Sequence, residues 1–274
     1  MNVPMKDRPI GIFDSGLGGL TAVKELEFLL PNESFVYFGD TGRIPYGTKS
    51  RETINKYAAQ DIRFLKSHHV KAILAACGTV SSVAGQMGDA CGLPFFDVLS
   101  ATAAAAVRTT KNGRIGVIGT PTTIASGAYR REILKQDPAL YVYEQACPMF
   151  VPLVENGYIS PHDEVVRLVV QRSISHMRKK EIDTLVLGCT HFPLLAAAIS
   201  SVIGQKVVLI SSGKEAAAAL SVFLQEQGLL KSPDIPTSRE FYVSDTTKVF
   251  QSVAEIFLGH SVCGDTARVD IEAY

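Results

Sequence analysis

The sequence predicts two parallel-sheet α/β domains of similar topology, and three observations support this fold class. Short apolar runs alternate with helical patterns along the 274 residues, which is typical of parallel sheets covered on both faces. The same order of elements then starts again just over 100 residues later. Two of the matched strands end in a cysteine, and open α/β sheets bind ligands at the carboxyl ends of their strands.

The first half of the chain contains three strand–helix pairs. Its apolar runs are PIGIF, SFVYF and VKAILA, which are short enough to be buried strands. The helices that follow them are expected at Leu17–Leu30, from about Ser50 to Ser67, and from Thr79 onward. This βαβα order implies a sheet with helices on both faces.

The second half repeats the first at a nearly constant offset. Ile10 of PIGIFDSG aligns with Ile115 of RIGVIGTP at an offset of 105, and Phe35 aligns with Tyr141 at an offset of 106. Cys77 aligns with Cys189 at an offset of 112, and this match extends beyond the strand. Three strands in one order favour a duplicated, pseudo-symmetric unit.

A further βαβ stretch follows the repeat. It comprises KVVLI (206–210), an Ala-rich helix over Lys214–Gln227 and FYV near 241, and it could extend either sheet. We place one boundary near Pro94–Ser100 and a second crossing near 205–212. The first domain is therefore expected at 1–97 plus about 210–274, and the second at 98–209, with the active site in the cleft between them.

Composition narrows the class of partner. Lys and Arg number 27 and Asp and Glu number 27, so the formal net charge is zero. This balance argues against general binding to nucleic acid or anionic membranes and favours a small-molecule substrate. The first residues lack an apolar signal segment, and no later run reaches the roughly 20 apolar residues of a membrane span. We therefore expect a cytoplasmic protein, with its five widely spaced cysteines reduced.

Cys77 and Cys189 are the strongest candidates for chemistry. Each follows a strand and precedes a predicted helix start, where free amides and the helix dipole favour a thiolate. Asp14 and His191 stand where they could exchange protons with these thiols. A pair of acid/base groups at equivalent strand ends can take a proton from one face of a carbon and return it to the other, as racemisation or epimerisation requires. The other cysteines, Cys91, Cys147 and Cys263, are interpreted as small apolar core residues.

Two polar loops are expected to border the same crevice. FDSGLGG (13–19) ends the first strand, and its glycines allow an anion to approach the backbone. GDTGRIPYGTKS (39–50) follows the second strand and contains Tyr46. Neither segment has the spacing of a dinucleotide-binding motif or a P-loop. In a parallel sheet these strand ends converge, which would bring Asp14, Tyr46 and Cys77 together.

Other chemistries fit less well. A thiol hydrolase could use a Cys/His/Asp set, but it needs one nucleophile and leaves the second cysteine unexplained. Zinc binding by Cys189 and His191 lacks the usual ligand spacing. No lysine stands in a context that suggests a Schiff base, and no motif calls for a cofactor or a metal.

These motifs resemble those of cofactor-independent glutamate racemases. FDSGLGG, GDTGRIPYG, the strand-end Cys77, ACPMFVPLVE (146–155) and LGCTHFPLL (187–195) occur in the same order in that family and cover nearly the whole chain. The resemblance implies two facing α/β domains with the active site between them. It also implies a bacterial cytoplasmic isomerase, commonly a homodimer, that supplies D-glutamate for peptidoglycan and hence for cell wall biogenesis and cell shape.

The resemblance also implies roles for individual residues. Cys77 would deprotonate D-glutamate and Cys189 would deprotonate L-glutamate, assisted by Asp14, His191 and Glu155. The substrate-binding positions would be Asp14, Ser15, Pro45, Tyr46, Gly47, Gly78, Thr79, Thr190 and His191.

One position departs from the family pattern. The family usually has Asn after its first cysteine, whereas this chain has Gly78. Loss of a buried amide contact would cost about 1.5 to 3 kcal/mol, so we expect Gly78→Asn to raise activity. The departure leaves two alternatives open: a racemase of a related amino acid such as aspartate, or a racemase-like binding or regulatory protein with impaired catalysis.

Overall fold

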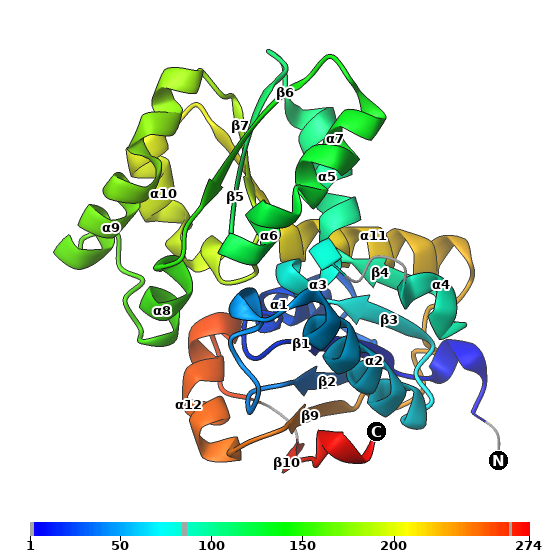
Figure 1. The fold of residues 1–274 in the computed structure, drawn as a ribbon. Helices are drawn as coiled ribbons and strands as arrows, with labels where there is room; N and C mark the ends of the chain where they lie inside the picture. The colour runs from blue at the N-terminus through cyan, green and yellow to red at the C-terminus, as the bar shows by residue number, and fades with distance from the viewer. Residues whose placement is uncertain (1–2, 84–86, 263–264) are drawn as a thin grey trace.

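The computed structural model describes residues 3–83, 87–262 and 265–274, and within them the chain forms two parallel sheets (Figure 1). Sheet A has the strand order β10-β9-β2-β1-β3-β4. Its strands are β1 (Ile10–Asp14), β2 (Phe35–Gly39), β3 (Ala72–Ala75), β4 (Phe95–Asp97), β9 (Arg239–Val243) and β10 (Asp265–Arg268). All its strand pairs are parallel, as predicted.

Sheet B has the strand order β6-β5-β7-β8 and is also parallel throughout. Its strands are β5 (Arg114–Gly119), β6 (Tyr141–Ala146), β7 (Thr184–Leu187) and β8 (Val208–Ser211). The order β6-β5-β7 repeats the order β2-β1-β3, with the strands matched in the sequence at equivalent places. The predicted fold class, two parallel-sheet α/β domains, is confirmed.

The helices cover both faces of each sheet. In the first domain they are α1 (Leu20–Leu29), α2 (Arg51–Ser67), α3 (Gly78–Val83), α4 (Met87–Cys91) and α12 (Thr247–Leu258). The remaining helices are α5 (Val98–Thr109), α6 (Pro121–Ser126), α7 (Ala128–Gln136), α8 (Phe150–Glu155), α9 (Glu164–Ile174), α10 (Ala196–Ile203) and α11 (Ser212–Glu226). Short 3-10 helices are η1 (Met5–Asp7), η2 (Tyr46–Thr48), η3 (Ser175–Lys180), η4 (Phe192–Leu195) and η5 (Ile271–Ala273). None of the helices in the described ranges has the length and apolarity needed to cross a bilayer.

Local sequence explains where α1 and α2 begin. Ser50 caps α2 by accepting a hydrogen bond from the Thr53 amide at 3.2 Å, and the helix ends at Ser67, as expected. α1 begins at Leu20 rather than Leu17, because the glycines before it form the turn that leaves β1. Gly19 must stay close to the Asp14 side chain in that turn, since a Cβ there would lie 2.7 Å from the Asp14 Cβ.

The further βαβ stretch is divided between the two sheets. β8 pairs with β7 through Ser211 in sheet B, whereas β9 pairs with β2 in sheet A. The return crossing therefore follows Ser211, slightly later than the expected boundary near 210. At the first crossing, the segment expected to contain the boundary, Pro94–Ser100, includes β4, where Phe95–Asp97 adds a short edge strand to sheet A. With these adjustments, we keep 1–97 plus about 210–274 and 98–209 as the proposed domain boundaries.

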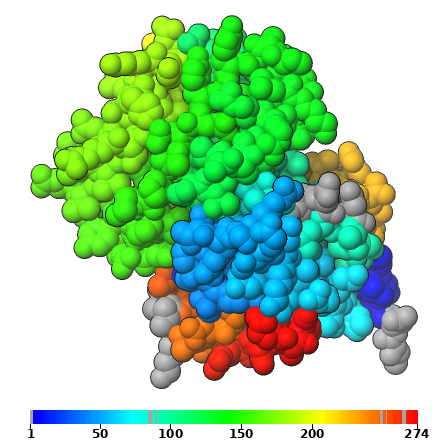
Figure 2. Space-filling model, viewed as in Figure 1, coloured from blue at the N-terminus to red at the C-terminus, as the bar shows by residue number. Residues whose placement is uncertain are grey.

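The core continues from one domain into the other. One buried cluster includes Ile12 and Leu20 of the first domain together with Leu185 and Phe192 of the second. α11 packs against both α1 and α5, so it connects the two halves. Figure 2 shows the region around residues 40–60, in blue, in direct contact with the green second domain above it. The two halves of the chain therefore meet at a packed interface.

Candidate active site

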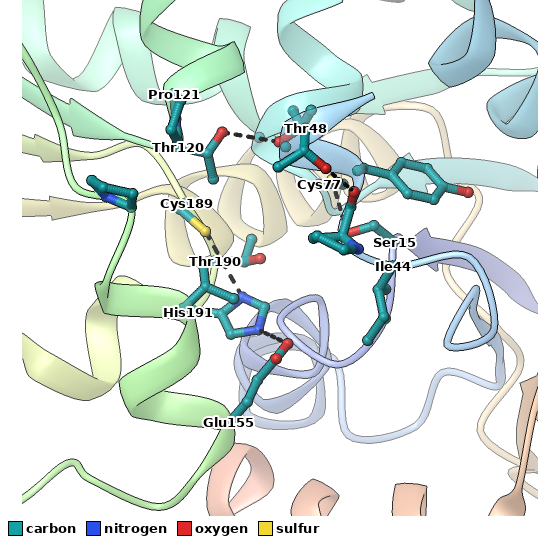
Figure 3. Close-up of a pocket in the computed structure, with 18 of the residues that line it drawn as sticks. Ser15, Ile44, Thr48, Cys77, Thr120, Pro121, Glu155, Cys189, Thr190 and His191 are labelled. Carbon is teal, nitrogen blue, oxygen red and sulfur yellow. Dashed lines mark hydrogen bonds and ion pairs between the residues drawn. The ribbon is translucent and has the colours of Figure 1, made fainter. Parts of the chain in front are cut away.

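A pocket of about 330 Å³ lies where the carboxyl ends of the central strands of both sheets meet. Its lining comes from segments that follow β1, β2 and β3 of sheet A and β5, β6 and β7 of sheet B. All the predicted site residues line it: Asp14, Ser15, Pro45, Tyr46, Gly47, Cys77, Gly78, Thr79, Glu155, Cys189, Thr190 and His191. In Figure 3, Cys77 and Cys189 approach the pocket from different sides.

Cys77 follows β3 directly and is the first thiol of the pocket. Only 4% of the residue is exposed, and its Sγ donates to the Ser15 Oγ at 3.4 Å. Burial raises the pKa of Cys77 to about 12, and the nearby Asp14 carboxylate adds to this effect. The expectation that the helix start lowers the pKa of this thiol is therefore wrong, because burial outweighs the helix-start amides.

Cys189 follows β7 after one glycine and belongs to a chain of three polar side chains. Its Sγ lies 3.8 Å from Nδ1 of His191, and Nε2 of the same ring lies 3.1 Å from Oε1 of Glu155 (Figure 3). Burial alone would lower the pKa of His191, but the contacts with Cys189 and Glu155 outweigh it and raise the pKa to about 10. These two contacts therefore favour the protonated form of His191, next to the second thiol.

Asp14 lies at the end of β1 and is 1% exposed. Burial raises the pKa of its carboxyl group, while the charge on His191 and backbone hydrogen bonds act in the opposite direction. Its Oδ2 accepts a hydrogen bond from the Gly16 amide at 3.1 Å. The turn that follows β1 thus holds the carboxyl group in place, near enough to Cys77 to influence its thiol through charge.

Tyr46 belongs to the pocket loop but directs its hydroxyl group away from it. The hydroxyl donates to the buried Asp40, whose Oδ2 also lies 2.6 Å from Nε of Arg43. The Arg43 guanidinium also contacts Asp61 at 3.4 Å and stacks 3.9 Å over the ring of Tyr57. This buried network fixes the loop from behind, so Tyr46 lines the pocket mainly through its ring and backbone.

Hydroxyl groups join the two sides of the pocket. Thr79 and Thr120 are 3.2 Å apart through their Oγ1 atoms, and Thr122 donates to the Gly47 carbonyl at 2.5 Å. Near Cys189, the Thr21 hydroxyl shares its hydrogen between the Gly18 carbonyl at 2.8 Å and the Thr190 carbonyl at 3.0 Å. These bonds hold the strand ends of one sheet against those of the other.

Several lining residues were not predicted from the sequence. They are Gly16, Ile44, Thr48, Thr120, Pro121, Cys147, Pro148, Val151 and Pro152. The offset of 105 between the first matched strands maps Ser15 onto Thr120, so the repeat already contained a signal for that residue. Cys147, Pro148, Val151 and Pro152 lie within the motif ACPMFVPLVE (146–155), which also gave a signal in the sequence.

The remaining cysteines have different positions. Cys91 is buried and packs in the core of the first domain, in agreement with its interpretation. Cys147 is buried in the core but also lines the pocket, and burial raises the pKa of its thiol to about 12. Cys263 lies outside the described residues. Among the residues that the structure describes, no group of three or more His, Cys, Asp or Glu side chains is arranged to hold a metal ion.

Gly78 faces the backbone of the other domain. A Cβ built on it would overlap the carbonyl oxygen of Gly188 and lie 3.3 Å from its carbonyl carbon. This geometry argues against the expected gain from Gly78→Asn, because a Cβ at this position overlaps the backbone of Gly188.

Comparisons with known proteins identify the family to which this chain is similar. Residues 23–220 match the family model described as Asp/Glu/Hydantoin racemase. The glutamate racemase of Chlorobaculum tepidum is 45% identical over 92% of this chain and 93% of its own length. That of Neisseria meningitidis serogroup A is 45% identical over 94% of this chain and 95% of its own length.

Solved structures show the same fold. The glutamate racemase of Francisella tularensis, in complex with D-glutamate, superposes with a TM-score of 0.91 at 40% identity, covering 98% of this chain and all of that one. An aspartate racemase of Picrophilus torridus has a TM-score of 0.56 at 21% identity, covering 81% of this chain and 94% of that one, a likeness of fold alone.

Proposed function

The chain belongs to the Asp/Glu/Hydantoin racemase family of isomerases, and we propose that it interconverts L-glutamate and D-glutamate with Cys77 and Cys189 as the two bases. The observation that carries this proposal is the placement of two buried thiols, from equivalent strand ends of two similar sheets, in one pocket. The names of relatives about 45% identical, and the D-glutamate complex of a structural relative, support glutamate as the substrate.

Two thiols are needed because the enantiomers differ in the face of the α-carbon that carries hydrogen. A single base returns a proton to the face from which it took it. In the proposed step, the Cys189 thiolate takes the α-proton of L-glutamate, and the electron pair of the C–H bond delocalises into the α-carboxylate. The Cys77 thiol then donates its proton to the opposite face, leaving Cys77 as thiolate and Cys189 as thiol. The reverse sequence converts D-glutamate.

The charges around the pocket fit this starting state. The raised pKa of Cys77 keeps it protonated, so it is ready to donate. The His191 cation, 3.8 Å from Cys189, stabilises negative charge on that sulfur. We assign His191 and Glu155 as the groups that assist Cys189, and Asp14 as the group that assists Cys77.

The remaining lining residues would bind the substrate. Hydroxyl groups and backbone amides around the pocket can hold two carboxylates and stabilise charge that develops on the α-carboxylate. We propose that the contact positions are Ser15, Pro45, Tyr46, Gly47, Gly78, Thr79 and Thr190. The two thiols supply both acid and base, so this mechanism uses no cofactor.

The direct test is racemisation of L-glutamate by the purified protein without pyridoxal phosphate, followed by circular dichroism. Cys77→Ser and Cys189→Ser should each lower kcat by about 10²- to 10⁴-fold, since each removes one acid/base group. Cys91→Ser, a buried thiol outside the pocket, serves as the control and should keep wild-type kcat. Undiminished activity in either pocket variant would exclude the two-thiol mechanism.

The substrate is tested by comparing kcat/KM for D-glutamate and D-aspartate. We expect a strong preference for D-glutamate, and a preference for D-aspartate would contradict the proposal. Glutamate binding without α-proton exchange in deuterated solvent would indicate a binding protein instead. In the cell, we propose that the chain acts in the cytoplasm as a homodimer and supplies D-glutamate for peptidoglycan, as the resemblance implies.

A further inference from the structure

We propose that Gly78 is a positioning residue whose missing side chain lets the two cysteine-bearing strand ends touch through their backbones. Gly78 follows Cys77 in the chain, and Gly188 precedes Cys189. The contact between these glycines would therefore set how the two thiols flank a bound substrate. This inference rests on the proposed racemase function and concerns the same pocket.

The contact leaves no room for a side chain on Gly78. A Cβ there would lie much closer than 3.0 Å to the backbone oxygen of Gly188, and Cβ atoms essentially never come that close to another atom. It would also lie 3.7 Å from Cα of Cys189. A flexible side chain could rotate away from such an overlap, but a carbonyl group within a strand end cannot.

Gly188 has no room to retreat. Its amide donates to the Ile118 carbonyl of β5 at 2.8 Å, which fixes it to sheet B. Behind it, a Cβ on Gly188 would meet the Ile118 oxygen at 2.8 Å and the Tyr129 ring at 2.9 Å. Tyr129 is fully buried. A side chain at Gly78 would therefore displace the strand ends of the two domains relative to each other rather than deform one of them.

Other contacts between the domains depend on the same close approach. Gly18 lies so close to Thr190 and His191 that a Cβ there would overlap both side chains. The Thr79–Thr120 and Thr21–Thr190 hydrogen bonds also cross between the two sets of strand ends. Separation at Gly78 would lengthen these bonds, and it would move Cys189 away from Cys77.

The expected size of the effect follows from the geometry. The strand ends must separate by more than about 1 Å before a Cβ reaches ordinary van der Waals contact, and a misplacement of about 1 Å can already lower a rate about 10²-fold. Cys77 is 4% exposed and Cys189 is 7% exposed. Separation of the two strand ends would therefore also give solvent and reagents access to both thiols.

The first experiment compares kcat and KM for Gly78→Ala, Gly78→Asn and Gly11→Ala. We expect kcat to fall about 10²-fold in both Gly78 variants, because they share the Cβ, while KM changes less than kcat. Gly11→Ala is the control outside the pocket, since its Cβ would meet the Val70 side chain at 3.1 Å, and a side chain can adjust. Its loss should be smaller. Wild-type kcat in Gly78→Ala, or a gain in Gly78→Asn, would overturn the proposal.

The second experiment does not depend on turnover. Alkylation of Cys77 and Cys189 by iodoacetamide, followed by mass spectrometry, should be about tenfold faster in Gly78→Ala than in the wild type, with Cys91 as the internal reference. Should the Gly78 variants be insoluble, Thr21→Val removes one hydrogen bond between the domains without adding bulk, and it should raise the alkylation rate in the same direction.

The two experiments separate the possible failures. A wild-type protein that does not racemise glutamate would refute the proposed function, and the alkylation rates would still test the contact. An active wild type with unchanged alkylation in the variants would refute the role of Gly78 and leave the proposed function intact.

Discussion

Glu155 should control the charge of His191, and Glu155→Gln tests this relation. The substitution keeps the shape of the side chain and a hydrogen-bonding group 3.1 Å from Nε2 of His191, but it removes the negative charge. Because Glu155 is one of the groups that raise the pKa of His191 to about 10, that pKa should fall. The contact with Cys189 remains, so the fall should be partial.

The magnitude follows from the energy of one charge-assisted hydrogen bond. Such a bond is worth about 1.5 to 3 kcal/mol, and about 1.4 kcal/mol corresponds to one pH unit, so the pKa of His191 should fall to about 8 to 9. At about pH 7 the ring stays protonated in both proteins. At about pH 9.5 the protonated fraction should be about three- to twentyfivefold lower in the variant.

Two measurements check this prediction. NMR titration of the histidine ring carbons gives the pKa of His191 directly, with His191→Asn used to assign the signal. The ratio of variant to wild-type kcat for L-glutamate, measured by circular dichroism, should decline from about pH 7 to about pH 9.5. The ratio cancels the titration of the substrate amine, which is common to both proteins.

A result can contradict this reasoning at either step. A wild-type His191 that titrates near 6.5 would show that its neighbours do not stabilise the cation. A lowered pKa with a constant kcat ratio would show that catalysis does not use the charge. Glu132→Gln is the control, because Glu132 pairs with Lys135 on the surface of α7, outside the pocket, and should leave both measurements unchanged.

Two further predictions concern stability. Lys71 is fully buried, and its Nζ lies 2.6 Å from Oε2 of Glu33. Lys71→Met should leave this buried carboxylate without its ion-pair partner and lower the free energy of unfolding, measured in urea, by about 3 to 5 kcal/mol. The double variant that also carries Glu33→Gln should recover part of this loss. An equally stable single variant would contradict this. Because the pKa of His191 is higher in the folded than in the unfolded chain, protonation of His191 stabilises the fold fully below pH 6.5, and this stabilisation is lost as the pH rises through about 10. The free energy of unfolding should therefore decline over that pH range in the wild type and decline less steeply in His191→Asn. Parallel declines in urea titrations of the two proteins would refute this assignment.

The elements that were predicted correctly are those whose sequence signal is local. The strands β1 and β2 are buried along their whole length, and continuous apolar runs identified them. The start of α2 could be identified because Ser50 is a capping residue. β4 and β10 are short edge strands, and the sequence DTAR of β10 has no apolar run that could have identified it.

The candidate site could be assembled from the sequence for a topological reason. In a parallel sheet the carboxyl ends of adjacent strands converge, so residues that follow matched strands meet whatever the intervening loops contain. The ionisation of these residues could not be predicted in this way. The pKa of Cys77 depends on burial and on Asp14, which lies 63 positions earlier in the chain. The charge of His191 depends on Glu155, which belongs to another helix.

Gly78 shows most clearly why the sequence alone misleads at a contact between domains. Compared with the family pattern, a glycine in place of asparagine suggests a missing amide and a weakened site. In the folded chain the same position adjoins the backbone of Gly188, which is 110 residues away, and the carbonyl oxygen of Gly188 leaves no room for a Cβ on residue 78. The effect of a substitution at Gly78 therefore depends on its distance from the backbone of Gly188, which the local sequence does not reveal. Variants that restore the family's asparagine should lose activity here unless the separation of the two strand ends changes with them.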